Sequence, residues 1–223
     1  MADAPTITVA PNGPYLVNGA ALVAKRWVET DKGEPVTSTS GQPIEANERY
    51  ALCRCGESGR KPFCDGTHAR VGFDGTETAA ARNPTRVTPA EGDGITVYDD
   101  RAVCVHAGFC GTAATNVWKM AGETGATDVR SQAIAMIERC PSGALSYRLS
   151  GSAQDNEPDL ASQVAIIPNG PIQITGAIAV TRSDGTALEV RNRVTLCRCG
   201  HSSNKPLCDG SHKEAGFKHD PLA

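Results

Sequence analysis

The sequence predicts an α+β protein made mostly of short β-strands, in which two similar β-rich modules pair and a small third module lies between them. Three observations support this prediction. A pattern of three Cys and one His occurs at 53–68 and again at 197–212, and all four residues recur 144 positions later. Strand-like segments precede both patterns, and three more cysteines lie between them. We therefore expect three modules, at 1–78, 90–150 and 159–223.

Three short strands are expected before each pattern. Residues 7–19 alternate apolar and polar side chains around a Pro-Asn-Gly-Pro turn, which predicts two strands, and residues 164–176 repeat this arrangement. A third strand, at 48–52 or 192–196, leads directly into each Cys-x-Cys. The first copy has 13 additional residues, expected as a loop within the polar stretch 29–42. Because three short strands are too little sheet to be stable alone, the two copies are expected to pair.

The composition bears on folding and on partners. Aromatic residues make up only 4% of the chain, so we expect bound metal to supply much of the folding free energy. The net charge is −3 and there is no basic block, which argues against nucleic acid or an anionic membrane as a partner. Residues 1–6 lack a basic region followed by an apolar run, so we expect no signal peptide, no membrane anchor and a cytoplasmic protein.

The repeated pattern favours metal over disulfides. Each copy has an odd number of cysteines, and a single residue separates Cys53 from Cys55, which would strain a bond between them. Nine cysteines in a reducing cytosol also point to metal. Structural zinc usually takes cysteines two to four residues apart, so this spacing fits zinc poorly. Thiolates joined by one imidazole also suit iron bridged by sulfide.

The full pattern is C-x-C followed by S-x-x-x-P-x-C-D-G-[S/T]-x-H, and both copies match it at every motif position. It resembles the CDGSH iron-sulfur domain of the mitoNEET-like family. The resemblance implies a 2Fe-2S cluster in each copy, held by three Cys and one His. It also implies a monomer whose repeats form an intramolecular pseudo-dimer about a pseudo-twofold axis. The implied ligands are Cys53, Cys55, Cys64, His68, Cys197, Cys199, Cys208 and His212.

The residues around the ligands suggest how each cluster is tuned. An Asp follows the third Cys at an N-cap position, so a short helix is expected to begin there, with its free N–H groups facing the anionic cluster. A Lys before the Pro either tunes the cluster by its charge or is a solvated surface residue. A neutral His ligand should raise the potential, couple it to pH and make the cluster acid-labile. These predicted cofactor-binding residues are Lys61, Asp65, Gly66, Lys205, Asp209 and Gly210.

The third module is predicted between linkers at 79–89 and 150–158. A strand at 95–98 precedes its first cysteine. A helix at 131–139 is expected to be capped by Ser131, with two isoleucines pointing inward, and the returning strand lies at 144–149.

Its cysteines are Cys104, Cys110 and Cys140, the last followed by Pro-Ser-Gly-Ala-Leu. The module resembles a single-cluster bacterial ferredoxin, most nearly the divergent mono-cluster type. The middle cysteine of the usual C-x-x-C-x-x-C run is replaced by Ala107. Three thiolates fit a 3Fe-4S cluster, which we rank first, whereas a 4Fe-4S cluster needs a fourth ligand, for which His106 is the candidate. A module that has lost its cluster is the third alternative.

The functional prediction is a soluble one-electron carrier. Its partner would be a redox protein, or an apo-acceptor of clusters if the chain is instead a cluster donor or a redox and pH sensor. A structural zinc protein is the remaining alternative. No nucleophile with a paired base and no nucleotide-binding fingerprint is visible, so no enzymatic activity is expected. His201 is not expected to be a ligand, because Glu57 occupies the equivalent position in the first copy, and His219 lies in the tail.

Overall fold

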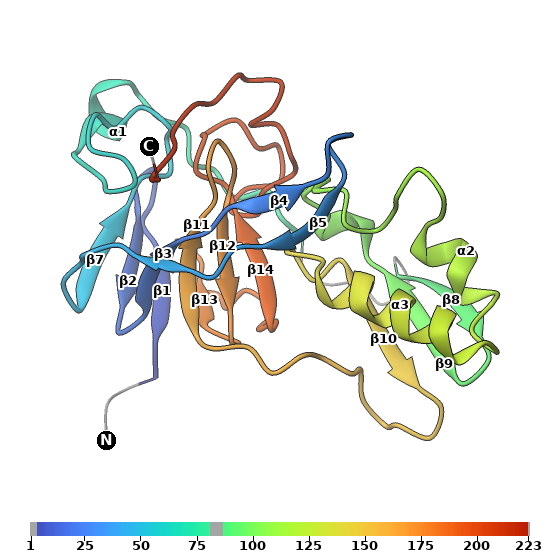
Figure 1. The fold of residues 1–223 in the computed structure, drawn as a ribbon. Helices are drawn as coiled ribbons and strands as arrows, with labels where there is room; N and C mark the ends of the chain where they lie inside the picture. The colour runs from blue at the N-terminus through green and yellow to red at the C-terminus, as the bar shows by residue number, and fades with distance from the viewer. Residues whose placement is uncertain (1–3, 81–86, 223) are drawn as a thin grey trace. The chain divides into compact units, whose positions relative to one another are not determined.

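The computed structural model describes residues 4–80 and 87–222 (Figure 1). The chain divides into two compact units. The repeat unit comprises Met1–Arg26, Thr39–Arg82 and Leu160–Ala223, and the middle unit comprises Trp27–Ser38 and Asn83–Asp159. Residues 81–86, within the expected linker 79–89, lie outside the described part of the chain.

The repeat unit contains two sheets. The first has the order β13-β1-β2-β7, formed by Ala179–Thr181, Thr6–Val9, Tyr15–Asn18 and Arg49–Leu52. The second has the order β14-β12-β11-β3-β6, formed by Arg193–Leu196, Ile172–Thr175, Gln163–Ile166, Ala21–Ala24 and Gln42–Pro43. The three strands expected before each Cys-x-Cys are therefore confirmed.

The two copies exchange strands within the chain. Strand β13 of the second copy pairs in parallel with β1 of the first, and β3 of the first copy pairs in parallel with β11 of the second. The exchanged strands occupy equivalent places in the two copies, because each follows the hairpin of its own copy. Each sheet is thus completed by the other copy, which is the intramolecular pseudo-dimer that was expected.

The alternation of apolar and polar residues explains which side chains of the first sheet are buried. Ile7, Val9, Tyr15 and Val17 point inward and are each 1% exposed, whereas the intervening Leu16 is 47% exposed. This burial pattern is the period of two that a strand with one buried face requires.

In its described residues, the middle unit has a three-stranded antiparallel sheet, a two-stranded hairpin and two α-helices. The strands β10, β9 and β8 lie in that order and span Leu145–Leu149, Ile95–Asp99 and Thr88–Gly92. The helices are α2 (Val117–Ala121) and α3 (Thr127–Glu138), and a short 3₁₀ helix, η2, spans Arg101–Val103. Its core includes one cluster of buried residues formed by Ile95, Val97, Val117, Ala121, Ile137, Cys140, Ala144, Leu145 and Tyr147.

Two expectations of local structure were wrong. Helix α3 begins at Thr127, so Ser131 lies inside it and donates its hydroxyl to the Thr127 carbonyl at 2.9 Å instead of capping it. The expected loop at 29–42 contains a hairpin, β4 (Trp27–Glu29) with β5 (Pro35–Ser38). The hairpin belongs to the middle unit, where Trp27 packs edge-on against Phe109 with ring centroids 5.8 Å apart. This long-range aromatic contact orders a segment whose local composition indicates a loop.

In the described residues, no helix has the length and apolar character needed to cross a membrane.

Candidate metal centres

Each Cys-x-Cys is placed by the strand that precedes it. Strand β7 ends at Leu52, and the N–H of Cys53 donates to the Pro62 carbonyl at 2.8 Å. The N–H of Cys64 then returns to the Ala51 carbonyl at 2.9 Å, so the loop closes on the strand end. In the second copy, Cys197 and Cys208 make the same two bonds, to Pro206 and Thr195, each at 2.9 Å.

The four predicted ligands of each copy form two pairs. In site 1, the Sγ atoms of Cys53 and Cys55 are 3.7 Å apart, and the Sγ of Cys64 is 3.3 Å from Nδ1 of His68. In site 2, the corresponding distances are 3.7 Å for Cys197 and Cys199 and 3.4 Å for Cys208 and His212. The two sites therefore have the same internal geometry.

These distances suit two ligands that share one tetrahedral metal. A metal that binds thiolates at about 2.3 Å holds two of them about 3.8 Å apart, and holds a thiolate and an imidazole about 3.5 Å apart. Within residues 4–80 and 87–222, no group of three or more Cys, His, Asp or Glu is arranged to hold a single metal ion. Each site offers two donor pairs, and each pair is spaced to share one metal, as a centre of two metals requires.

Backbone N–H groups point at the thiols. Gly66 donates to the Sγ of Cys64 at 3.5 Å, and Glu57 donates to the Sγ of Cys55 at 3.4 Å. In site 2, burial raises the pKa of Cys208 to about 12, while the N–H of Gly210 acts in the opposite direction. Because a thiol must lose its proton to bind metal, occupation of this site must release protons.

The expected Asp N-cap was wrong. Helix α1 (Thr67–Arg70) occurs only in the first copy and has Gly66 at its N-cap, whereas residues 211–216 form turns. Asp65 instead closes the loop, since its carboxylate accepts from Thr67 at 3.0 Å and from Gly59 at 2.8 Å. These hydrogen bonds hold the pKa of Asp65 well below its usual range.

Asp209 plays the same part in site 2. Its carboxylate accepts from the backbone of Ser211 at 3.0 Å and of Ser203 at 2.8 Å. Burial opposes ionisation here, but the bonds from Ser211 and Ser203 keep the pKa of Asp209 below its usual range.

The two predicted lysines bind their own loops. Both side chains are half-buried. Nζ of Lys61 donates to the Ser58 carbonyl at 2.7 Å, and Nζ of Lys205 donates to the Ser202 carbonyl at 2.8 Å. Each ammonium group is thus fixed inside the loop that carries the ligands.

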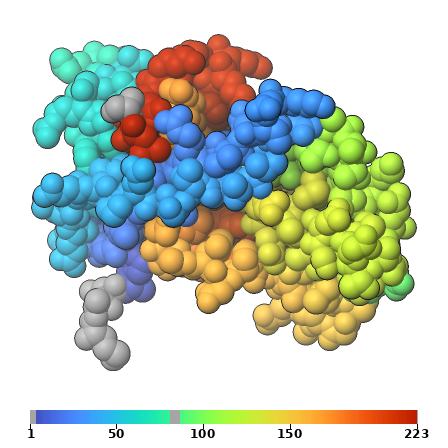
Figure 2. Space-filling view, in the orientation of Figure 1, coloured from blue at the N-terminus to red at the C-terminus, as the bar shows by residue number. Residues whose placement is uncertain are grey.

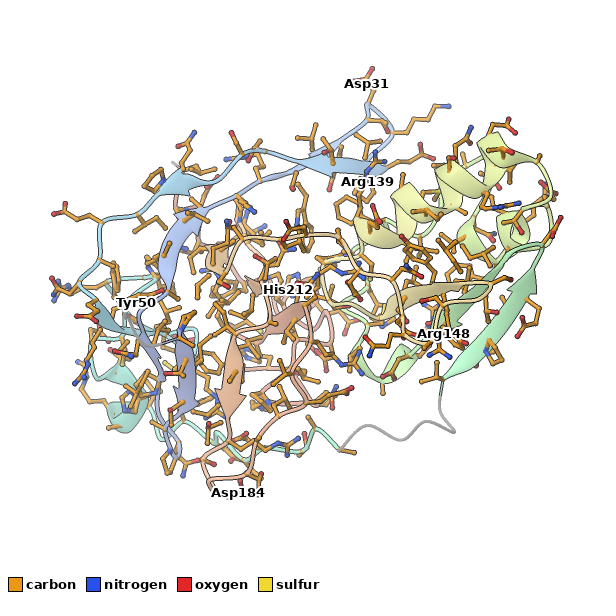
Figure 3. All side chains as sticks on the ribbon, turned by 90° about the horizontal axis from the view of Figure 1, so that it is seen from below. Asp31, Tyr50, Arg139, Arg148, Asp184 and His212 are labelled. Atoms are coloured by element: carbon orange, nitrogen blue, oxygen red, sulfur yellow. The ribbon has the colours of Figure 1, made fainter. Side chains whose placement is uncertain are left out.

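The two histidines differ in exposure. His68 is half-buried, whereas His212 is 6% exposed. Figure 3 labels His212 among the side chains of the repeat unit. Burial lowers the pKa of His212 to about 4. This imidazole is therefore neutral at physiological pH, which is the form that binds metal.

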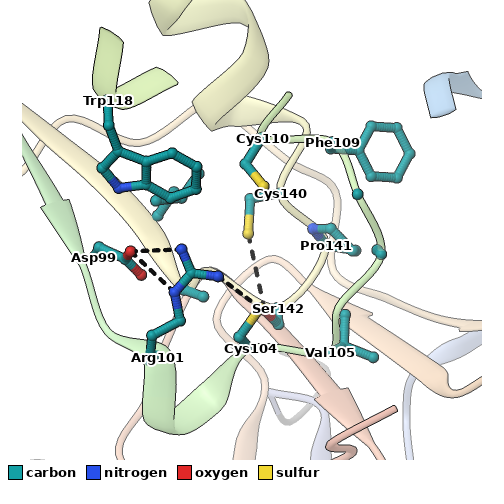
Figure 4. Close-up of a pocket in the computed structure, with 14 residues that line it drawn as sticks. Asp99, Arg101, Cys104, Val105, Phe109, Cys110, Trp118, Cys140, Pro141 and Ser142 are labelled. Atoms are coloured by element: carbon teal, nitrogen blue, oxygen red, sulfur yellow. Dashed lines mark hydrogen bonds and ion pairs between the residues drawn. The ribbon is translucent and has the colours of Figure 1, made fainter. Parts of the chain in front are cut away.

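The three cysteines of the middle unit line one pocket. Figure 4 shows the sulfur atoms of Cys104, Cys110 and Cys140 pointing into this space. Ala107 is part of the lining, whereas His106 is exposed and does not belong to it. The pocket thus joins three thiols that are up to 36 residues apart in the sequence.

A cation also lines this pocket. The guanidinium of Arg101 binds Asp99 through Nε at 3.1 Å and Nη2 at 2.8 Å, and lies 4.8 Å from the ring centroid of Trp118 (Figure 4). Its Nη1 is 4.0 Å from the Sγ of Cys104. The sequence analysis missed Arg101, because its distance from the thiols depends on the turn of η2.

Sequence reasoning also missed the arginine inside each Cys-x-Cys and the tyrosine after the first Pro-Asn-Gly-Pro turn. Arg54, Arg198 and Tyr15 are all fully buried. The alternation of apolar and polar residues predicts that Tyr15 points inward, but no local feature of the sequence indicates the hydrogen-bond partners of its hydroxyl. Nδ1 of His201 lies 2.7 Å from the carbonyl oxygen of Cys199.

Two sites with three thiols and an imidazole, and a pocket with three further thiols, define an iron-sulfur protein. Comparison with known families supports this class directly. Residues 12–69 and 169–213 match the family described as iron-binding zinc finger, CDGSH type, and residues 90–150 match the family described as divergent 4Fe-4S mono-cluster. The chain is therefore an iron-sulfur cluster-binding protein with two CDGSH-type regions flanking a divergent 4Fe-4S mono-cluster region. Among curated proteins, none matches the chain.

Proposed function

We propose that this protein is a soluble, cytoplasmic one-electron carrier with three clusters. Sites 1 and 2 each bind a 2Fe-2S cluster, and the middle pocket binds a 3Fe-4S or a 4Fe-4S cluster. The observation that carries the proposal is the division of the four ligands in each site into two pairs with the spacing of shared tetrahedral ligands. The clusters supply one-electron redox chemistry, and the protein determines their potential and access.

In sites 1 and 2, the paired cysteines of Cys-x-Cys would hold one iron, and the third cysteine with the histidine would hold the other. The backbone N–H groups that point at the thiols would stabilise the anionic centre and raise its potential. The neutral histidine would act in the same direction, because it adds no negative charge.

In the middle pocket, three thiols and Ala107 at the remaining position favour 3Fe-4S over 4Fe-4S. His106 would complete a 4Fe-4S site only after its side chain turned into the pocket. The positive charge of Arg101 beside Cys104 would raise the potential of either cluster.

A second candidate function is transfer of an intact cluster to an apo-acceptor. The partial exposure of His68 favours it, because a solvent-accessible ligand is more readily displaced. In either function the protein would act as a monomer and catalyse no reaction of its own. Its partner would be a redox protein or an apo-acceptor.

The test is to mix the reduced holoprotein with an oxidised ferredoxin, and the oxidised holoprotein with an apo-ferredoxin, and to count clusters by native mass spectrometry. A carrier transfers electrons in seconds and keeps all its clusters. Loss of one cluster to the apo-protein, with slow electron exchange, would favour the donor function and contradict the carrier.

A further inference from the structure

A buried arginine lies between the paired cysteines of each CDGSH motif. Arg54 is 1% exposed, although arginine is seldom buried without a partner for its charge. Its guanidinium donates to the carbonyls of Ala10, at 3.3 Å, and of Gly75, and its Nε has no hydrogen-bond partner among the described residues. A buried cation of this kind is costly unless an anion is close. The thiolates on either side of Arg54 would be such anions.

Arg198, the counterpart in the second copy, is 3% exposed. It donates to the carbonyls of Ile167 at 2.6 Å and Gly170 at 2.8 Å, and to Nδ1 of His219 at 2.8 Å. In both copies, then, the arginine fastens the Cys-x-Cys turn to the Pro-Asn-Gly-Pro region and to the segment after the motif.

The contacts of the two arginines continue into the opposite copy. The Arg54 guanidinium lies 5.7 Å from the ring centroid of Tyr15, and the Tyr15 hydroxyl donates to the carbonyls of Cys197 at 2.7 Å and Pro206 at 3.1 Å. Burial raises the pKa of Tyr15 well above its ordinary value, so this hydroxyl remains a donor. Tyr15 therefore ties the first copy to the loop that carries the ligands of site 2.

His219 makes the reverse connection. Because the guanidinium of Arg198 can only donate, Nδ1 of His219 accepts and the proton of a neutral ring is on Nε2. The backbone of Lys61, in the loop of site 1, also acts on this ring, because it opposes the lowering of the His219 pKa by burial. Arg198 lies between Cys197 and Cys199 in the sequence, so its hydrogen bond joins His219 to the ligand loop of site 2.

The turns after the two Cys-x-Cys segments also touch directly. A Cβ atom added to Gly56 would lie 2.5 Å from the carbonyl oxygen of Cys199, and one added to Gly200 would lie 2.5 Å from that of Cys55. The two turns therefore pack backbone against backbone, and displacement of one displaces the other.

From these contacts we propose that sites 1 and 2 are a coupled pair, in which Tyr15, Arg198 and His219 are positioning residues that let a cluster in one site stabilise the cluster in the other. The inference rests on the proposed function, since it requires both sites to bind clusters. A bound cluster orders its own loop, and the contacts transmit that order to the opposite loop. Such a coupling acts equally in both directions.

The test uses the full-length holoprotein at constant neutral pH. Site 1 is emptied by Cys64→Ala, and the release of the site 2 cluster to an iron chelator is followed by native mass spectrometry and by the paramagnetic resonance of the reduced protein. We expect release about five- to tenfold faster than from the parent, as the loss of one or two buried hydrogen bonds would produce. Hydrogen exchange at the Cys197 amide should increase in parallel, which reports on the loop without relying on the cluster.

Tyr15→Phe separates coupling from general destabilisation, because it removes only the hydroxyl. Alone, it should speed release from site 2 about two- to tenfold. In this background, emptying site 1 should add less than it does in the parent, which is the mark of coupled positions. Tyr50→Phe is the matched control, because the Tyr50 hydroxyl bonds the Ala20 carbonyl within the first copy. It should leave release from site 2 within about twofold, because the hydrogen bond that it removes lies within the first copy.

Release from site 2 that is unchanged when site 1 is empty would overturn the coupling while leaving the proposed function intact. Equal effects of Tyr15→Phe and Tyr50→Phe would also overturn it. If Cys64→Ala does not fold, His219→Ala tests the reverse direction and should speed release from site 1, and no change would overturn the proposal. A parent protein without iron in either site would instead contradict the proposed function.

Discussion

Substitution of Gly56 by Ala tests the close approach of the two Cys-x-Cys-Gly turns. Gly56 has a φ of +83°, and its Cβ would lie 2.5 Å from the Cys199 carbonyl oxygen, where ordinary contact begins at 3.4 Å. The turns would therefore have to separate by about 0.9 Å. A positive φ costs a residue with a Cβ about 1–2 kcal/mol, and overpacking adds about 1–3 kcal/mol. We expect Gly56→Ala to lower the free energy of unfolding by about 2–5 kcal/mol.

Gly185 supplies the control for this experiment. It lies in the same unit, has a φ of +84°, and has no atom within 4 Å of its Cβ position. Gly185→Ala should therefore cost only the backbone part, about 1–2 kcal/mol. The assay is thermal unfolding of both variants at matched iron content, where each kcal/mol corresponds to about 2–4 °C. Equal shifts for the two variants would refute the packing of one turn against the other.

Three further predictions concern the ligands, the middle cluster and the assembly. Replacing His68 or His212 by Cys should lower the potential of that cluster and slow its loss in acid. The folded pKa of His212 is depressed to about 4, so its contribution to stability is present above about pH 6.5 and is lost as the pH falls to about 4. Unchanged acid loss in the Cys variants would remove the histidines from the ligand set. Arg101→Gln should lower the potential of the middle cluster in a redox titration. Arg148→Gln is the control, because it removes a similar arginine that is stacked on Tyr98 outside the pocket, and it should leave the potential unchanged. Equal effects of the two variants would count against a local role for Arg101. Because the strands are exchanged within one chain, the holoprotein should sediment as a monomer, and a stable dimer would contradict that arrangement.

The strands and the ligand loops could be predicted from the sequence because both depend on short-range patterns. A period of two defines β1 and β2, and the loop that joins Cys53 to Cys64 is closed by residues of the motif and of the strand that leads into it. Because the pattern is repeated in the sequence, the same prediction could be made for the strands and ligand loop of the second copy.

Features that depend on distant partners could not be predicted. No local feature of the sequence shows which copy each exchanged strand joins. The hairpin at 27–38 forms where Trp27 meets Phe109, and the helix after Asp65 has no counterpart after Asp209, although the two sequences are alike there. Arg54 follows no rule of periodicity, since a charged residue between two ligands would ordinarily be expected at the surface.

Both ligand-rich loops lie at the same end of the repeat unit, where the space-filling view shows the teal and red segments side by side (Figure 2). The central claim is that these two loops and the middle pocket hold three iron-sulfur clusters. The most direct test is the iron, acid-labile sulfide and zinc content of anaerobically purified protein. We predict about seven iron and eight sulfide per chain with a 3Fe-4S cluster in the middle, or about eight of each with a 4Fe-4S cluster, and no zinc. About four of each would leave the middle pocket empty, and zinc in place of iron would contradict the redox function.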